Sequence, residues 1–246
     1  MAFDMHYRAA IFDMDGTILD TSEDLTAAVN YAMGRFGHRS DFSTEDGRLF
    51  FGSGAHTAIQ RALAREAGME RGELLRIGSA ANSVVPGIDE DEVLRILEVY
   101  QPYYKAHNAV RTRAYPGITD LLKRLRAAGV RTAVVSNKPD NSVVQLAADY
   151  FDGEFDLAIG ETAGIARKPA PDMNLLILDK LGVDVKNAVY IGDTEIDLAT
   201  ARNTGMDLIL VGWGFRPKKE LEALGAACFA DTADDVFSLI KRGAAG

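Results

Sequence analysis

Two carboxylates, Asp13 and Asp15, stand one residue apart, directly after the apolar residues 10–12 and directly before Gly16 and Thr17. A carboxylate can attack an electrophile, bind a cation or exchange a proton, so a close pair could divide these tasks. Two like charges at this spacing repel each other, and a cation bound between them would remove that repulsion. Taken alone, however, the Asp15-Gly16 step is more typical of a simple turn.

Two later stretches also place polar side chains directly after apolar runs, and a loop that follows a further apolar run carries a lysine. They supply, in chain order, Ser136-Asn137-Lys138, then Lys168, and then Asp193 with Asp197. A hydroxyl group and a lysine suit a bound oxyanion, whereas clustered carboxylates suit a hard cation such as Mg²⁺. Together with the first pair, these stretches predict a site for a metal ion and a phosphate group.

Each of these stretches has a simpler explanation when it is considered alone. Ser136 and Asn137 could cap the helix that follows them, and Lys168 could be an ordinary solvated lysine. Asp193 could also cap a helix, with Asp197 in the first turn of that helix, where the helix dipole favours an acid. All of these explanations together require four coincidences, so we favour the functional interpretation.

The expected secondary structure brings the four stretches to one edge of a sheet. Strands are predicted at residues 8–12, 130–135, 155–159, 187–191 and 208–211, with a weaker sixth at 226–229. Helical periodicity between most of them, as at residues 118–128, predicts a doubly wound, Rossmann-like parallel sheet of the α/β class. Ligands of such sheets bind beyond the carboxyl ends of the strands, which is where these polar residues lie.

A long helical stretch interrupts this alternation. More than a hundred residues separate the first two predicted strands, although such connections usually have only a few. We therefore expect an inserted α-helical cap domain at residues 18–109 and an α/β core at residues 1–17 and 110–246. A capping box of Thr21 and Asp24 should open the first inserted helix, and Pro102 should bend or end a later one.

The composition excludes several classes of function. The chain has 246 residues and a net charge of −9, which disfavours binding to duplex nucleic acid. Its single cysteine, Cys228, permits no disulfide framework within the chain. No stretch approaches the roughly 20 apolar residues of a membrane helix, and the amino terminus does not resemble a signal peptide. We expect a cytoplasmic protein, monomeric or homodimeric, without nucleic-acid or membrane partners.

Four motifs, DMDGTILD, VVSN, RKPAPD and GDTEID, resemble in order and spacing those of the haloacid dehalogenase superfamily. The helical insertion after the first motif resembles the small-cap class of that superfamily. The segments GDTEIDLATARNTGM, GWGF, SNK and AYPGI are similar to the phosphoglycolate phosphatase branch. Dehalogenases of the superfamily lack an acid two residues after the nucleophile, so the presence of Asp15 indicates phosphate-ester chemistry.

The resemblance implies roles for the matching acids. Asp13 would be the nucleophile, and Asp15 would donate a proton to the leaving group and later take one from water. Mg²⁺ would be held by Asp13, by the backbone carbonyl of Asp15 and by Asp193. Thr17 would position Asp15, and Asp197 would orient Lys168 or reach the metal through water.

The resemblance also implies how a phosphorylated substrate would bind. Ser136, Asn137 and Lys168 would hold the phosphate group, and Lys168 would also take part in catalysis. Substrate contacts are expected at a further set of residues, four of them in the cap domain: Arg48, Gly52, Ser53, Gly54 and Lys138. A surface position is an equally good explanation for Arg48.

These expectations define a Mg²⁺-dependent phosphatase of small phosphomonoesters that acts through an aspartyl-phosphate, with 2-phosphoglycolate as the first candidate substrate. A phosphomutase of the β-phosphoglucomutase type is the alternative, because it would share Asp13 and Asp15 while retaining a bisphosphorylated intermediate. A pyrophosphatase or nucleotidase is a further alternative. A non-catalytic binding protein is disfavoured, since Asp13, Asp15, Lys168 and Asp193 are all present.

Overall fold

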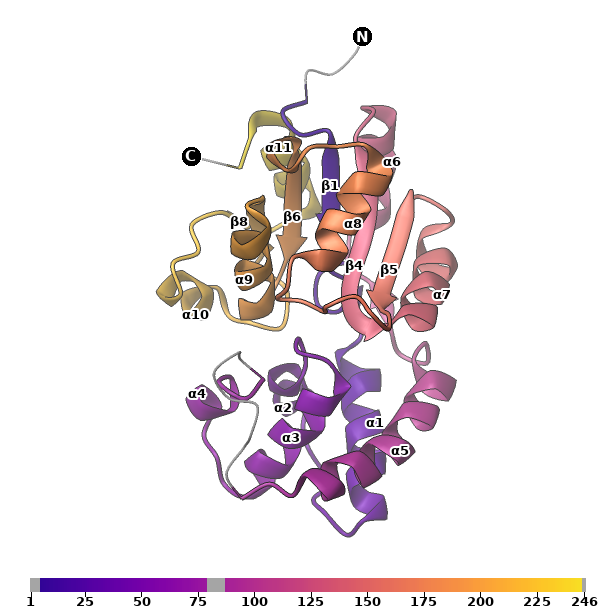
Figure 1. The fold of residues 1–246 in the computed structure, drawn as a ribbon, viewed down its shortest axis with the longest axis vertical. Coiled ribbons are helices and arrows are strands. Elements are labelled where there is room, and N and C mark those ends of the chain that lie inside the picture. Colours follow the sequence, from indigo (N-terminus) through magenta and orange to yellow (C-terminus); the bar gives the residue numbers. More distant parts are fainter. Residues whose placement is uncertain (1–4, 79–86, 245–246) are drawn as a thin grey trace. The chain divides into compact units, whose positions relative to one another are not determined.

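The computed structural model describes residues 5–78 and 87–244, and the chain divides into two compact units. The core unit comprises Met1–Asp20 and Arg113–Gly246, and the helical unit comprises Thr21–Thr112 (Figure 1). The division falls at Asp20 and Thr112 rather than after residues 17 and 109. Strands β2 (Leu19–Asp20) and β3 (Arg113–Ala114) pair with each other in antiparallel register, and this pairing keeps both segments in the core unit.

A six-stranded parallel sheet forms the centre of the core unit, in the order β5-β4-β1-β6-β7-β8. The strands are β1 (Ala9–Phe12), β4 (Arg131–Pro139), β5 (Leu157–Glu161), β6 (Ala188–Gly192), β7 (Asp207–Val211) and β8 (Phe229–Ala230). All six overlap strands that the sequence predicts, although β4 continues four residues beyond its predicted end and β8 shares only Phe229 with the predicted stretch. The central strand β1 pairs with β4 on one side and with β6 on the other.

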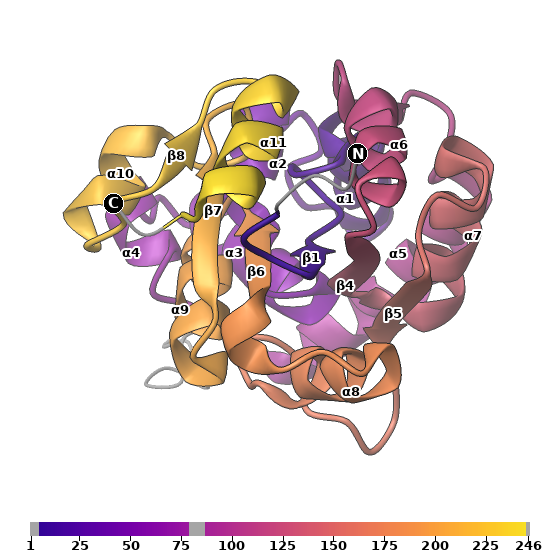
Figure 2. The same ribbon diagram turned by 90° about the horizontal axis from the view of Figure 1, so that it is seen from above.

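Helices cover both faces of this sheet, which confirms the doubly wound α/β fold. Alternate residues of a strand point to opposite faces. Phe12 therefore packs with buried residues of α6 (Ile118–Ala127), α7 (Asp140–Phe151) and α11 (Ala233–Arg242). Ile11 packs on the other face with α8 (Asp172–Leu181) and α9 (Glu195–Thr204), and Figure 2 shows α8 and α11 on opposite sides of the strands. The short α10 (Lys218–Ala223) and a 3₁₀ turn (Val185–Asn187) complete the core unit.

The helical unit packs around its own apolar interior. It contains α1 (Ser22–Arg35), α2 (Thr44–Phe50), α3 (Ala55–Glu66), α4 (Arg71–Leu74) and α5 (Glu90–His107). Pro102 does not end α5, because the helix continues to His107 and buries Tyr104 beyond the proline. No helix among the described residues is long and apolar enough to cross a membrane.

The first helix of this unit begins differently from the prediction. Thr21 precedes α1, but its side chain makes no capping hydrogen bond, so the expected capping box with Asp24 is not formed. The buried Asp24 carboxylate instead accepts hydrogen bonds from the Arg111 amide, at 2.9 Å, and from the Thr112 amide and hydroxyl, both at 2.9 Å. Asp24 therefore fastens the outgoing segment of the helical unit to its returning segment.

Candidate active site

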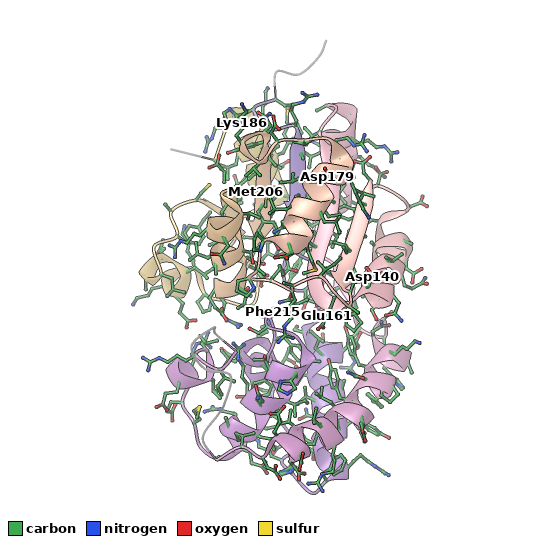
Figure 3. All side chains as sticks on the ribbon, viewed as in Figure 1. Asp140, Glu161, Asp179, Lys186, Met206 and Phe215 are labelled. Atoms are coloured by element: carbon green, nitrogen blue, oxygen red, sulfur yellow. The ribbon has the colours of Figure 1, made fainter. Side chains whose placement is uncertain are left out.

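The carboxyl edge of the core sheet gathers the predicted residues of the core unit. Asp13 directly follows β1, and Asp193 directly follows β6. Ser136 lies within the last part of β4, because that strand continues to Pro139. In Figure 3 the labelled Glu161 and Phe215 lie toward this edge, whereas Lys186, which precedes β6, lies toward the opposite edge.

Lys168 is the cation at the centre of the site. Its Nζ lies 2.8 Å from Asp13 Oδ1 and 2.9 Å from Asp197 Oδ1, and it donates to the Tyr190 hydroxyl at 3.0 Å. Burial alone lowers the pKa of Lys168, but the Asp13 and Asp197 carboxylates outweigh it and hold the pKa well above the usual value. The lysine therefore stays charged and binds two of the predicted acids at once.

Asp197 holds Lys168 from the first turn of α9. Its Oδ1 accepts from Lys168 and, at 3.1 Å, from the Tyr190 hydroxyl. Its Oδ2 accepts from the Asp193 amide at 3.1 Å, from the Thr194 amide at 3.0 Å and from the Thr194 hydroxyl at 2.8 Å. Burial raises the pKa of Asp197, but Lys168 and these donors bring it below the usual value. The carboxylate is thus ionised and fixed in place.

Asp193 is fixed from two sides by groups distant in the sequence. Its Oδ1 accepts from the Thr17 hydroxyl at 2.9 Å, and its Oδ2 accepts from the Phe215 amide at 2.6 Å. A Cβ atom added to Gly16, whose φ is +86°, would lie 2.2 Å from Asp193 Oδ2, and one added to Gly214 would lie equally close to Asp193 Cβ. Glycine is required at both positions, because any side chain would displace the aspartate.

The acidic cluster fits a hard divalent cation. Asp13, Asp193 and Asp197 are all buried and offer carboxylate oxygens within 4.8 Å of one another. Burial, together with the neighbouring acids, raises the pKa of Asp13 to about 7 despite Lys168 and raises that of Asp193 well above its usual value. A divalent cation would compensate this concentration of negative charge, and oxygen ligands alone are the set preferred by hard cations.

Asp15 lies beside a second lysine. Lys138 Nζ is 3.2 Å from Asp15 Oδ1, and the Lys138 side chain is only 3% exposed. The sequence predicts Lys138 as a substrate contact, and the structure places its ammonium group against the carboxylate of the predicted proton donor. Lys138 therefore positions Asp15 in addition to any contact with a substrate.

Ser136 and Asn137 lie in the same strand as Lys138. The Ser136 hydroxyl accepts from the Lys138 amide at 3.3 Å, and the Asn137 side-chain amide donates to the Lys168 carbonyl at 3.0 Å. Asn137 thus ties the strand that carries the predicted phosphate ligands to the loop that carries the central lysine. Neither residue caps a helix through its side chain, since α7 begins at Asp140 after Pro139.

The predicted substrate contacts at residues 48 and 52–54 belong to the helical unit. Arg48 lies in α2, and Gly54 precedes α3 with a φ of +85°. Ser53 is buried, and its hydroxyl accepts from the buried Arg61 at 3.4 Å. Arg61 also donates to the Leu49 carbonyl at 3.0 Å, so it holds the loop that contains Ser53. The assignment of these residues to substrate binding stays a prediction.

Two contributors to the site have little or no signal in the sequence. Tyr190 lies within β6, where it reads as an apolar strand residue, yet its hydroxyl contacts both Lys168 and Asp197. A buried tyrosine hydroxyl usually finds a hydrogen-bond partner, which is the one clue to its position. Phe215 contributes through its backbone amide, a group that every residue except proline has, so residue type could not reveal it.

Comparisons with known proteins agree with this geometry. The family of haloacid dehalogenase-like hydrolases matches residues 10–211. Phosphoglycolate phosphatase 1 of Pseudomonas aeruginosa PAO1 is 29% identical over 238 residues, covering 96% of this chain and 81% of that protein. The phosphoglycolate phosphatase of Pseudomonas fluorescens Pf0-1 is 30% identical, covering 85% and 70%. A crystal structure from Lactobacillus delbrueckii subsp. bulgaricus, named as a candidate phosphoglycolate phosphatase, is 51% identical with a TM-score of 0.94, covering 96% and 99%.

The matched range contains Asp13, Lys168, Asp193 and Asp197, so it includes the whole acidic cluster and its central lysine. The similarity to the Lactobacillus structure extends over both compact units. The chain therefore belongs to the haloacid dehalogenase-like hydrolases and, within them, to the phosphoglycolate phosphatase-like phosphoric monoester hydrolases with a helical cap.

Proposed function

We propose that this chain is a Mg²⁺-dependent phosphatase of small phosphorylated metabolites, acting in the cytoplasm, with 2-phosphoglycolate as the first candidate substrate. The observation that carries the proposal is the position of Lys168 between Asp13 and Asp197, with Asp193 in the same buried cluster. A lysine fixed at an acidic site can attract a phosphate group that the acids alone would repel.

Asp13 is the nucleophile in this proposal. Its carboxylate oxygen forms a bond to phosphorus while the bond from phosphorus to the ester oxygen breaks, and Asp15 donates a proton to the departing alcohol. The product on the enzyme is an aspartyl-phosphate. Asp15 then accepts a proton from water, the water oxygen attacks phosphorus, and inorganic phosphate leaves while the Asp13 carboxylate is restored.

Other residues hold the reacting groups during both steps. Lys168 and Ser136 bind the phosphoryl oxygens, assisted by the backbone of Asn137, and Lys138 keeps the Asp15 carboxylate in place. Asp13, Asp193 and the backbone carbonyl of Asp15 would hold Mg²⁺. The ion would supply positive charge that lets an anionic nucleophile approach an anionic phosphate.

The choice of 2-phosphoglycolate rests on the names of the relatives in Pseudomonas aeruginosa and Pseudomonas fluorescens. A small substrate with a carboxylate beside its phosphate needs a second anion-binding group. Arg48 and the backbone amides of Gly52, Ser53 and Gly54 are the candidates for this contact in the helical unit.

A panel of phosphorylated metabolites, assayed for release of inorganic phosphate with and without Mg²⁺, tests the proposal. We expect 2-phosphoglycolate to be hydrolysed with Mg²⁺ and not in the presence of a chelator. Asp13→Asn should lose essentially all turnover, because the amide cannot form the phosphoryl intermediate. Asp179→Asn, at an exposed position in α8, is the matched control and should retain wild-type turnover.

Two results would contradict the proposal. Substantial turnover by Asp13→Asn would exclude Asp13 as the nucleophile. Isomerisation of a hexose 1-phosphate without net release of phosphate would identify the enzyme as a phosphomutase.

A further inference from the structure

An ion pair between the buried Arg216 and the partly buried Glu195 lies next to the proposed metal site but is not part of the catalytic scheme. Arg216 Nε donates to Glu195 Oε2 at 2.7 Å, and a second guanidinium nitrogen donates to Glu195 Oε1 at 3.1 Å. The Arg216 side chain is 1% exposed and that of Glu195 is 17% exposed. Two parallel hydrogen bonds of this kind fix both the distance and the orientation of the two side chains.

The pair joins the two backbone segments that hold Asp193. Glu195 begins α9, two residues after Asp193, and Arg216 directly follows Phe215, whose amide binds Asp193 Oδ2. Gly214, on the other side of Phe215, approaches the Asp193 side chain so closely that no Cβ could fit there. The loop after β7 must therefore keep a fixed position against the start of α9, and the ion pair spans these two segments.

Stability alone is a poor explanation for this arrangement. A buried ion pair loses much of its attraction to the cost of removing both charges from water, and apolar replacements are often equally stable. A two-point contact of this kind fixes the geometry of the two side chains, because the planar guanidinium group binds a carboxylate in one orientation. We therefore regard the pair as a source of geometric specificity. The residue that benefits from this geometry is Asp193.

We propose that the Arg216–Glu195 pair is a positioning device that sets the Phe215 amide, and through it the Asp193 carboxylate, for binding of the divalent cation. This inference rests on the metal site in the proposed function. Both residues act through Asp193 and neither touches the ion. Removal of a group that orients a metal ligand in this way typically lowers metal affinity by about 10-fold to 100-fold.

Direct binding of Mn²⁺ tests the inference without any measurement of catalysis. Mn²⁺ accepts the same oxygen ligands as Mg²⁺. The concentration of free Mn²⁺ can be measured by electron paramagnetic resonance, which gives the fraction bound. We expect Arg216→Met to weaken Mn²⁺ binding by about 10-fold or more. Arg216→Lys, which keeps the charge but loses the two-point contact, should fall between Arg216→Met and wild type.

The double variant Glu195→Gln with Arg216→Met controls for destabilisation of the fold. It removes both charges, so no carboxylate is left without its arginine. It should bind Mn²⁺ about as weakly as Arg216→Met alone, since both changes remove the same contact. Arg131→Met is the control, because it breaks the ion pair with Asp156, 3.2 Å in length, whose partners are 52% and 30% exposed. That variant should leave Mn²⁺ affinity unchanged.

The outcomes separate this inference from the proposed function. Wild-type affinity in a folded Arg216→Met or double variant would overturn the positioning role while leaving the metal site intact. Failure of the wild-type protein to bind Mn²⁺ would contradict the metal site itself.

Discussion

Lys168 satisfies two acids that would otherwise repel each other in a buried position. Its ammonium group contacts Asp13 and Asp197, and the same two carboxylates raise its pKa. Asp197 is held by three further donors on its other oxygen, so the lysine is anchored from the side of α9. Asp13 is consequently the partner from which the lysine can turn toward a phosphate group.

Replacement of this lysine tests its role at the residue scale. Lys168→Met keeps most of the apolar side chain but removes the cation that pairs with Asp13 and Asp197. We expect kcat for phosphate release to fall by at least about 100-fold, because fixed charges that stabilise a transition state have effects of this size. Lys180→Met, at an exposed position in α8, should behave as wild type in steady-state kinetics. A fall of less than about 3-fold at Lys168 would contradict the assignment.

The secondary structure of the core unit was largely predictable from sequence. Short apolar runs predicted β1, β6 and β7. The helices α8 and α9 end at Gly182 and Gly205, which adopt the left-handed conformation that glycine favours at such ends. Helix starts were less predictable, because several residues near a start can supply a cap. Capping boxes open α2 and α11, while the one expected at α1 is absent because Asp24 binds the returning segment.

The site was predictable to the extent that it consists of side chains after strands. Asp13 and Asp193 follow the neighbouring strands β1 and β6, and the carboxyl ends of parallel strands lie at one edge of the sheet. The pairing of Lys138 with Asp15 and the contact of Phe215 with Asp193 depend on loop paths that hydrophobic patterns do not encode. Local sequence therefore indicates which acids gather at this edge of the sheet, but it does not indicate the groups that orient them.

The capping box of α11 supplies a prediction about pH at the element scale. The Thr232 hydroxyl and backbone donate to Asp235, at 2.8 and 2.9 Å, and keep the pKa of this carboxyl below its usual value. A lowered folded-state pKa gives stability that is present above the unfolded pKa, about 3.9, and is lost as pH falls through the folded pKa. Asp235→Asn should therefore lower the melting temperature near neutral pH and have little effect in acid.

The Thr232→Ala background provides the control for this experiment. Without the threonine hydroxyl, the main cause of the lowered pKa is gone, so the pH dependence of the Asp235→Asn effect should shrink. An effect of Asp235→Asn that is equal at all pH values would contradict the prediction.

At the scale of the whole molecule, the chain leaves the core unit and returns to it through neighbouring segments. Strands β2 and β3 pair within the core unit, and Asp24 fastens residues 111 and 112 within the helical unit. The Asp24 carboxylate receives these hydrogen bonds in a buried position. Loss of this carboxylate would leave backbone donors unsatisfied next to the connection between the units.

Two adjacent acids allow a matched test of that contact. Asp24→Ala should lower the free energy of unfolding by about 2 kcal/mol or more, because a hydrogen bond to a charged group contributes about 1.5 to 3 kcal/mol and the two Thr112 donors are buried. Glu23→Ala removes a partly exposed ion pair with Arg111 and should cost no more than about 1 kcal/mol. Denaturant titration measures both, and equal effects would contradict the special role of Asp24.

The β2–β3 pairing has a consequence for how the sequence could tolerate an insertion of this size. The ends of a flexible loop are brought together at an entropic cost that grows with loop length. Here residues 20 and 113 already face each other in register, and the inserted residues form a compact body of their own. The folding of the insertion therefore offsets the entropic cost of closing this loop. The core sheet does not have to offset that cost. Variation in the length or helix content of the insertion should consequently leave Asp13 and its neighbouring acids undisturbed.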